Sequence, residues 1–172
     1  AWMEFKGVPV LYTPYISFPV DNRRLSGFLS PTWGRTQRNG FDVALPFYWN
    51  MAPNFDTTIT ARYMDLRGGM LRNKFRYMTE MSQGMFNAEI LPYDQLKDNS
   101  RYAGNFRDIT NFTEHLHTNT NLNYVSDKEY FNDLNNALGF QTDRFQPSTA
   151  YVNYTRPDVH FSAGMQHYQS VD

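Results

Sequence analysis

The sequence predicts an all-β protein built from antiparallel strands, and three observations favour this class. Aromatic residues make up 17% of the chain, with 14 Phe and 12 Tyr, and aromatic residues favour strands. Apolar and polar residues alternate with a period of two in several segments, as they do in strands with two different faces. Proline and glycine recur through the first 40 residues and exclude long helices there.

Composition excludes several classes of function. Lys and Arg number 16 against 17 Asp and Glu, a net charge of -1, so no basic excess points to nucleic acid. The chain has no cysteine, which removes disulfides, thiolate zinc sites and cysteine nucleophiles. Its longest apolar run, Val43 to Trp49, is far shorter than the roughly 20 residues of a transmembrane helix.

The alternation predicts the strands in order. Residues 1–40 are expected to hold short strands and turns. Longer strands follow at 41–49 and 55–63, joined by a turn at 50–54. After a turn at 67–69, further strands are predicted at 71–77, 86–90, 115–124, 150–154 and 159–168, with a polar connection at Pro92 and 94–100 and a turn at 156–158. The whole predicts roughly seven or eight strands in a meander.

Two architectures fit this pattern. Soluble β-sandwiches and membrane β-barrels both alternate, so the period alone does not choose between them. Strands of about nine residues match the ~9–11 needed to cross a bilayer. Aromatic residues recur at strand ends, at Phe47, Trp49, Phe55, Tyr63 and Tyr77. Both features favour the membrane barrel, while a soluble β-domain stays open because aromatic strand ends also occur in cores.

Four cations share the polar positions of two predicted strands. They are Arg62, Arg72, Lys74 and Arg76. If the turn at 67–69 joins adjacent strands, they form one basic patch facing the lumen of a barrel. Such a patch suits the phosphates of lipid A or the carboxylates of core sugars. The alternative is a solvated barrel wall, partly neutralised by Asp42, since charged lumens are general to such barrels.

No residue pattern predicts catalysis, a metal or a cofactor. His115 and His117 stand two apart on one predicted strand, but a metal site needs a third ligand and Asn119 is a poor one. The chain shows no nucleophile with a base, no phosphate-binding glycine loop and no close carboxylate pair. The sequence therefore predicts a protein that is not an enzyme.

Several motifs are specific enough to indicate a family. Residues 7–20 are followed by Arg23-Arg24-Leu-Ser-Gly-Phe-Leu-Ser-Pro31, and then by Leu45-Pro-Phe-Tyr-Trp-Asn-Met-Ala-Pro-Asn54. Next come Thr58-Ile-Thr-Ala-Arg-Tyr-Met64 and, further on, Tyr130-Phe-Asn-Asp133. In content and order these motifs resemble the LptD family of outer-membrane lipopolysaccharide assembly proteins. The resemblance covers most of residues 7–135.

The resemblance implies a fragment of a large transmembrane β-barrel in the outer membrane of a Gram-negative cell. Residues 1–40 would be the end of a periplasmic β-jelly-roll with its connector, and residues 41–172 the first barrel strands. The implied partners are lipopolysaccharide, outer-membrane lipid, an LptE-like plug lipoprotein and an LptA-like periplasmic bridge protein. A different outer-membrane barrel, such as a small channel or adhesin, and a soluble carbohydrate-binding β-sandwich remain as alternatives.

Pro46 lies in the middle of the first long predicted strand, where it offers no N–H to a neighbour. Strand prolines are normally confined to edges or bulges, so an ordinary edge strand is one interpretation. The resemblance implies instead a lateral gate at Pro46, Phe47 and Trp49. Such a gate is a weak seam between the first and last barrel strands, through which lipopolysaccharide leaves sideways. The family often has a second proline where this chain has Ala61.

Overall fold

The computed structural model describes residues 2–5, 8–12, 24–134 and 145–170, which form antiparallel sheets and one short helix. A two-stranded sheet pairs β1 (Trp2–Phe5) with β2 (Val8–Tyr12). A ten-stranded sheet contains β3 (Gly27–Phe28), β4 (Thr32–Thr36), β5 (Gly40–Ala52), β6 (Phe55–Met64), β7 (Gly68–Met78), β8 (Ser82–Asp94), β9 (Asn99–Asn111), β10 (Leu116–Val125), β11 (Phe145–Arg156) and β12 (Val159–Ser170). The all-β, antiparallel prediction is confirmed.

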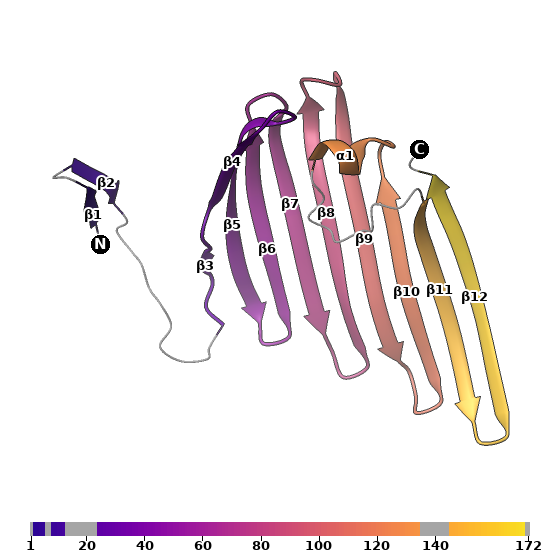
Figure 1. Ribbon diagram of the computed structural model, residues 1–172. Coiled ribbons are helices and arrows are strands. Elements are labelled where there is room, and N and C mark those ends of the chain that lie inside the picture. Colours follow the sequence, from indigo (N-terminus) through magenta and orange to yellow (C-terminus); the bar gives the residue numbers. More distant parts are fainter. Residues whose placement is uncertain (1, 6–7, 13–23, 135–144, 171–172) are drawn as a thin grey trace.

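The large sheet is a meander. From β5 to β12 each strand pairs with the next one along the chain, and short hairpin turns close the lower end of the sheet (Figure 1). Helix α1 (Tyr130–Leu134) follows β10 and lies at the upper end of the sheet. β3 and β4 both pair with the remaining edge of β5, so part of the first 40 residues joins this sheet.

The predicted connection at Pro92 and 94–100 is present but shorter, because the structure confines it to residues 95–98. β8 continues through Pro92 to Asp94, and β9 begins at Asn99. Pro92 is tolerated because the β8–β9 register shifts between Leu91 and Asp94, and such an irregularity needs no N–H from the proline. The sequence does not predict β9, because Gly104 and Asn105 interrupt the alternation of apolar and polar residues along this strand.

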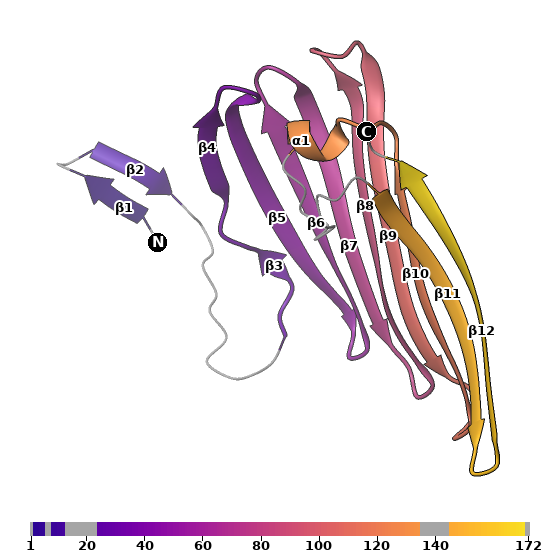
Figure 2. The ribbon, with the colours of Figure 1, turned by 45° about the vertical axis from the view of Figure 1, so that its right-hand side comes forward.

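Helix α1 packs against one face of the sheet at its upper end (Figure 2). The buried apolar residues gather beneath it: Met64, Met70, Leu91, Ala103, Val125, Tyr130, Phe131 and Leu134. Five of them come from the upper ends of β6 to β10 and three from α1 itself. In the described part of the chain, no helix is long and apolar enough to cross a membrane.

Candidate functional site

The ten-stranded sheet has two chemically different faces. One row of directly paired residues runs across five strands as Leu45, Ala61, Leu71, Ile90 and Tyr102. We call the side that bears this row the apolar face. Leu45, Leu71, Ile90 and Tyr102 are each between 42% and 48% exposed, so none of the described elements covers them. The opposite side, which bears α1, is called the polar face.

Aromatic side chains mark both ends of the apolar face. Near the upper end the rings of Tyr102 and Tyr124 stack with centroids 5.8 Å apart. Near the lower end Phe75 stacks on Phe55 at 6.2 Å and on Tyr77 at 6.1 Å. An apolar band flanked by two aromatic rims is typical of strands whose outer side meets lipid.

The structure brings the four predicted cations, Arg62, Arg72, Lys74 and Arg76, together on the polar face of β6 and β7. Three of them are neutralised by carboxylates. Arg62 donates to Asp42, with 2.8 Å between Nε and Oδ1. Arg76 donates from Nε to Asp56 at 2.8 Å. Arg72 Nε lies 3.2 Å from Glu89 Oε1 as an ion pair.

Lys74 differs from its three neighbours. It is exposed, and among residues 24–134 and 145–170 no carboxylate pairs with it. Arg107 of β9 is also exposed, and its Nε contacts only the side chain of Asn121, at 3.3 Å, in the described structure. These two cations retain free positive charge on the polar face, whereas Arg62, Arg72 and Arg76 are paired with carboxylates.

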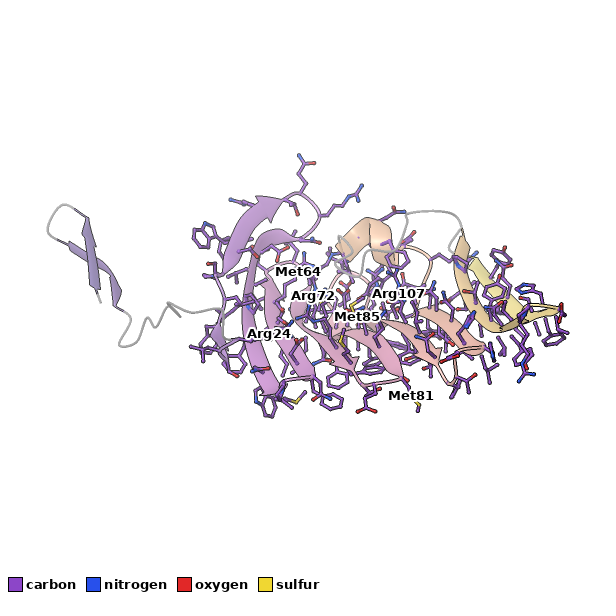
Figure 3. All side chains as sticks on the ribbon, turned by 90° about the horizontal axis from the view of Figure 1, so that it is seen from below. Arg24, Met64, Arg72, Met81, Met85 and Arg107 are labelled. Carbon is purple, nitrogen blue, oxygen red and sulfur yellow. The ribbon has the colours of Figure 1, made fainter. Side chains whose placement is uncertain are left out.

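A pocket of about 490 Å³ opens at the lower end of the sheet. Its lining includes Arg24, Arg76 and Arg107, together with Asp56 and Met85. Arg24 and Arg76 both pair with Asp56, at 3.2 and 2.8 Å. Arg107 and Met85 lie on the side of the sheet that carries α1 (Figure 3). The lining also includes Asp108, so the pocket combines three basic and two acidic side chains with apolar surface.

Buried charges hold α1 on the polar face. The side chain of Arg101 is 1% exposed and donates to Asp94 at 3.0 Å, to Asp127 at 2.6 Å and to Asp133 at 2.9 Å. Arg67 donates to the same Asp94 at 2.7 Å. Both buried cations are paired with more than one carboxylate, so their charges are compensated. Removing one member of the network would leave a buried charge without its partner and would destabilise the fold.

Two further contacts fix the helix to neighbouring strands. The hydroxyl of Tyr130 donates to Glu89 Oε2 at 2.7 Å, and Arg62 donates to the backbone oxygen of Leu134 at 2.8 Å. Burial raises the pKa of Tyr130, and the nearby Glu89 carboxylate adds to this effect. Tyr130 therefore stays a neutral donor at physiological pH.

Sequence reasoning missed this network. Burial by itself would raise the pKa of Asp127, but hydrogen bonds from Arg101 and Ser126 outweigh burial and hold that pKa below its usual value. The alternation of Arg101, Ala103 and Asn105 with Tyr102 and Gly104 was the available signal for β9. Nothing local in the sequence pairs Arg101 with Asp127 or Asp133, which lie 26 and 32 residues away.

The structure puts Pro46 in the interior of β5, paired with Thr60 of β6. Its carbonyl oxygen accepts a hydrogen bond from the N–H of Leu29 at 2.9 Å. In an antiparallel strand the N and the C=O of one residue point to the same side. The missing donor of Pro46 therefore faces β3 and β4, and the β5–β6 ladder loses nothing by it.

The edge opposite Pro46 is itself broken. Phe28 pairs with Phe47 and Thr32 pairs with Ala44, so residues 29–31 oppose only residues 45–46. This two-against-three arrangement is a bulge, and Pro31 lies within it. A proline thus stands on each side of this break, Pro46 in β5 and Pro31 between β3 and β4. Beside it the rings of Phe28 and Phe47 pack edge to face at 5.1 Å, and Trp49 is 49% exposed.

No group of three or more His, Asp or Glu side chains in the described part of the chain could hold a metal ion. His117 pairs across the sheet with Asn153, and the ring of His115 packs edge to face on Tyr154 at 6.2 Å. The two histidines thus have ordinary neighbours on a sheet surface.

Comparison with known proteins gives consistent matches. The family model LptD, described as LPS transport system D, matches residues 99–172. The LPS-assembly protein LptD of Methylococcus capsulatus is 44% identical over 172 residues, covering 100% of this chain and 17% of that protein. The protein of the same name from Histophilus somni is 37% identical over 177 residues, covering 100% of this chain and 23% of that protein.

A third relative adds to this result. The LPS-assembly protein LptD of Nitrosomonas europaea is 43% identical over 152 residues, covering 87% of this chain and 21% of that protein. The chain therefore spans about a fifth of the length of the curated relatives it matches.

Proposed function

Since this chain is a homologue of the LPS-assembly protein LptD along its whole length, we propose that it forms part of an outer-membrane translocon that inserts lipopolysaccharide into the outer leaflet. The relatives carry the name of an assembly protein, and the proposed role is transport without catalysis.

The observation that carries the proposal is the difference between the two faces of one sheet. The apolar face is uncovered and has aromatic rims, as strands in contact with lipid require. The polar face carries the cations, the amides and α1, as the wall of an aqueous lumen requires. A soluble sandwich would need a second sheet on the apolar face, and residues 24–134 and 145–170 provide none.

The proposed division of the chain assigns residues 1–40 to the end of a periplasmic jelly-roll and its connector, and residues 41–172 to barrel strands. β3 and β4 lie in this connector and pair with β5. We use the word seam for the contact of β5 with β3 and β4. The lateral gate is proposed at this same edge of β5, where the first barrel strand would meet the last one, with Pro46 weakening the contact and with Phe47 and Trp49 presenting rings where the lipid would leave.

The proposed partners follow from the same homology. Lipopolysaccharide would contact the polar face, with Lys74 and Arg107 available for its anionic groups and Arg62, Arg72 and Arg76 held by carboxylates. Outer-membrane lipid would cover the apolar face. An LptE-like lipoprotein would fill the lumen, and an LptA-like bridge would join through periplasmic segments N-terminal to the barrel.

Depletion in cells tests the proposal. The full-length gene is placed under a repressible promoter, and lipopolysaccharide at the cell surface is labelled as the protein declines. The proposal expects surface lipopolysaccharide to fall while an unrelated outer-membrane barrel keeps its abundance. Unchanged surface lipopolysaccharide after complete depletion would favour a different outer-membrane barrel.

A further inference from the structure

Tyr151 occupies a distinctive place on the polar face of β10, β11 and β12, which lie side by side (Figure 1). It pairs directly with Asn119 on one side and with Gly164 on the other. The next row consists of His117, Asn153 and Ser162. These six residues are called the Tyr151 surface. None of them is Asp, Glu, Lys or Arg.

Gly164 leaves room for the ring of Tyr151, because it has no side chain. A Cβ atom built on Gly164 would overlap Cδ1 and Cε1 of Tyr151, so the ring lies over the glycine. The side chain of Tyr151 is nevertheless 39% exposed. One side of the ring thus rests on backbone while the rest remains open, and the position of the ring depends on the absence of a side chain at residue 164.

Hydrogen-bonding groups surround this ring. Ser162 donates to Asn153 Oδ1 at 2.8 Å, which leaves the amide NH₂ of Asn153 available. In the described structure no hydrogen bond from the side chain of Asn119 is found, and that residue is exposed. Each amide carries donors and an acceptor, and the imidazole of His117 adds another polar group in the next row.

An exposed ring bordered by neutral donors and acceptors matches the chemistry of a sugar. The C–H groups on one side of a pyranose are weakly positive and fit the negative face of an aromatic ring. Its hydroxyls, at the rim, both donate and accept, as amides and hydroxyls do. A phosphate would instead need fixed cations, and the two free cations of this polar face, Lys74 on β7 and Arg107 on β9, stand four and two strands from β11.

We propose that the Tyr151 surface binds saccharide, with Tyr151 as the stacking platform and Asn119 and Asn153 as the hydroxyl partners. This inference rests on the proposed function and adds to it a division of the polar face. The saccharide part of lipopolysaccharide would contact β10 to β12, and its phosphorylated part would contact the cations of β7 and β9.

Binding is tested with the full-length gene product purified in detergent. The first probe is core oligosaccharide freed of lipid A, and the second is lipid A alone. Tyr151→Ala is expected to weaken oligosaccharide binding about tenfold, and Tyr151→Phe, which keeps the ring, to weaken it less than threefold. Gly164→Ala should also weaken it, because the added methyl displaces the ring. Lipid A binding should be unchanged in all three variants.

The matched control is Tyr154→Ala, which removes a tyrosine from the apolar face of the same strand and should leave oligosaccharide binding unchanged. Equal oligosaccharide binding by Tyr151→Ala and wild type would overturn the inference, and so would equal loss of both probes. These binding results do not depend on lipopolysaccharide export in cells. Failure of the depletion experiment therefore removes the proposed transport role, while failure here removes only the saccharide surface.

Discussion

Leu29 and Pro46 share one hydrogen bond where an unbroken antiparallel ladder would have two. The N–H of Leu29 donates to the oxygen of Pro46 at 2.9 Å, and the proline ring leaves the carbonyl of Leu29 without the reciprocal donor. The seam is thus weakened at one definite point, within the bulge that also contains Pro31.

Pro46→Ala would restore that donor. A hydrogen bond of this kind contributes about 0.5–1.5 kcal/mol, so the seam should be stronger and lipopolysaccharide export slower. The measurement is surface lipopolysaccharide and antibiotic permeability in cells with equal amounts of wild-type and variant protein. Pro147→Ala, which changes a strand proline of β11 remote from the seam, is the control. Normal lipopolysaccharide export by a correctly assembled Pro46→Ala protein would show that Pro46 does not form the gate.

Met165 and Gln166 are neighbours near the middle of β12 and lie on opposite faces of the sheet. Met165 is 80% exposed on the apolar face. If that face meets lipid, Met165→Arg should cost about 2–4 kcal/mol, whereas Gln166→Arg on the polar face should be tolerated. Heat-resistant migration of the folded protein in gels and its abundance in outer membranes report the outcome. Equal tolerance of both variants would contradict the assignment of the two faces.

Arg101→Ala should be severely destabilising. It would leave Asp94, Asp127 and Asp133 without their shared cation, and removing one partner from a buried ion network costs about 3–5 kcal/mol. The free energy of unfolding in urea, measured in detergent, gives the value. Arg107→Ala, an exposed position on the same strand, should change it by no more than about 0.5 kcal/mol. A similar small change for Arg101→Ala would mean that α1 is not held by these charges.

The docking of α1 on the polar face of the sheet should depend on pH only under acidic conditions. Because the pKa of Asp127 is below its usual value, ionised Asp127 stabilises the docked state above pH about 4, and this stabilisation is lost as pH falls through the lowered pKa. Hydrogen exchange in residues 127–134, corrected for intrinsic rates, should be constant from neutral pH to about pH 5 and then accelerate. Asp127→Asn should exchange faster at neutral pH and lose most of the acid step. An identical acid step in that variant would show that Asp127 is not its source.

Lys74 should matter more for anion binding than its neighbour Arg76. Lys74 has no carboxylate partner among the described residues, whereas Arg76 is committed to Asp56. Lys74→Gln should weaken lipid A binding about fivefold at low salt and less at high salt, since screening reduces exposed electrostatics. Lys128→Gln, an exposed cation beside α1, serves as the comparison. A salt-independent loss, or none, would exclude Lys74 from an anion site.

The sequence predicted those parts of the fold that depend on local alternation. Phe41 to Trp49 and Leu116 to Tyr124 each show one apolar face, and both became strands with that face exposed. The ion pair of Asp42 with Arg62 was also predicted, although the register pairs Asp42 with Met64 and the contact is diagonal.

The rest depended on contacts between distant residues. α1 is too short to show helical periodicity, and it is buried by partners on β6, β8 and β9. Charge counting could not reveal that Glu89 and Asp56 neutralise Arg72 and Arg76, because their pairing follows from strand register. For the same reason the sequence alone does not indicate the role of Gly164, because only the strand register shows that this glycine lies under the ring of Tyr151.

The meander also determines the order in which the chain can assemble. Because each strand from β5 to β12 pairs with its successor, every connection apart from the one between β10 and β11 closes over a short stretch of sequence, and loops of this kind cost little entropy. Docking of α1 differs, because Arg62 reaches the oxygen of Leu134 across 72 residues. Successive hairpins can therefore join the growing sheet one at a time, whereas the helix finds its complete set of partners only after β6 to β10 have formed.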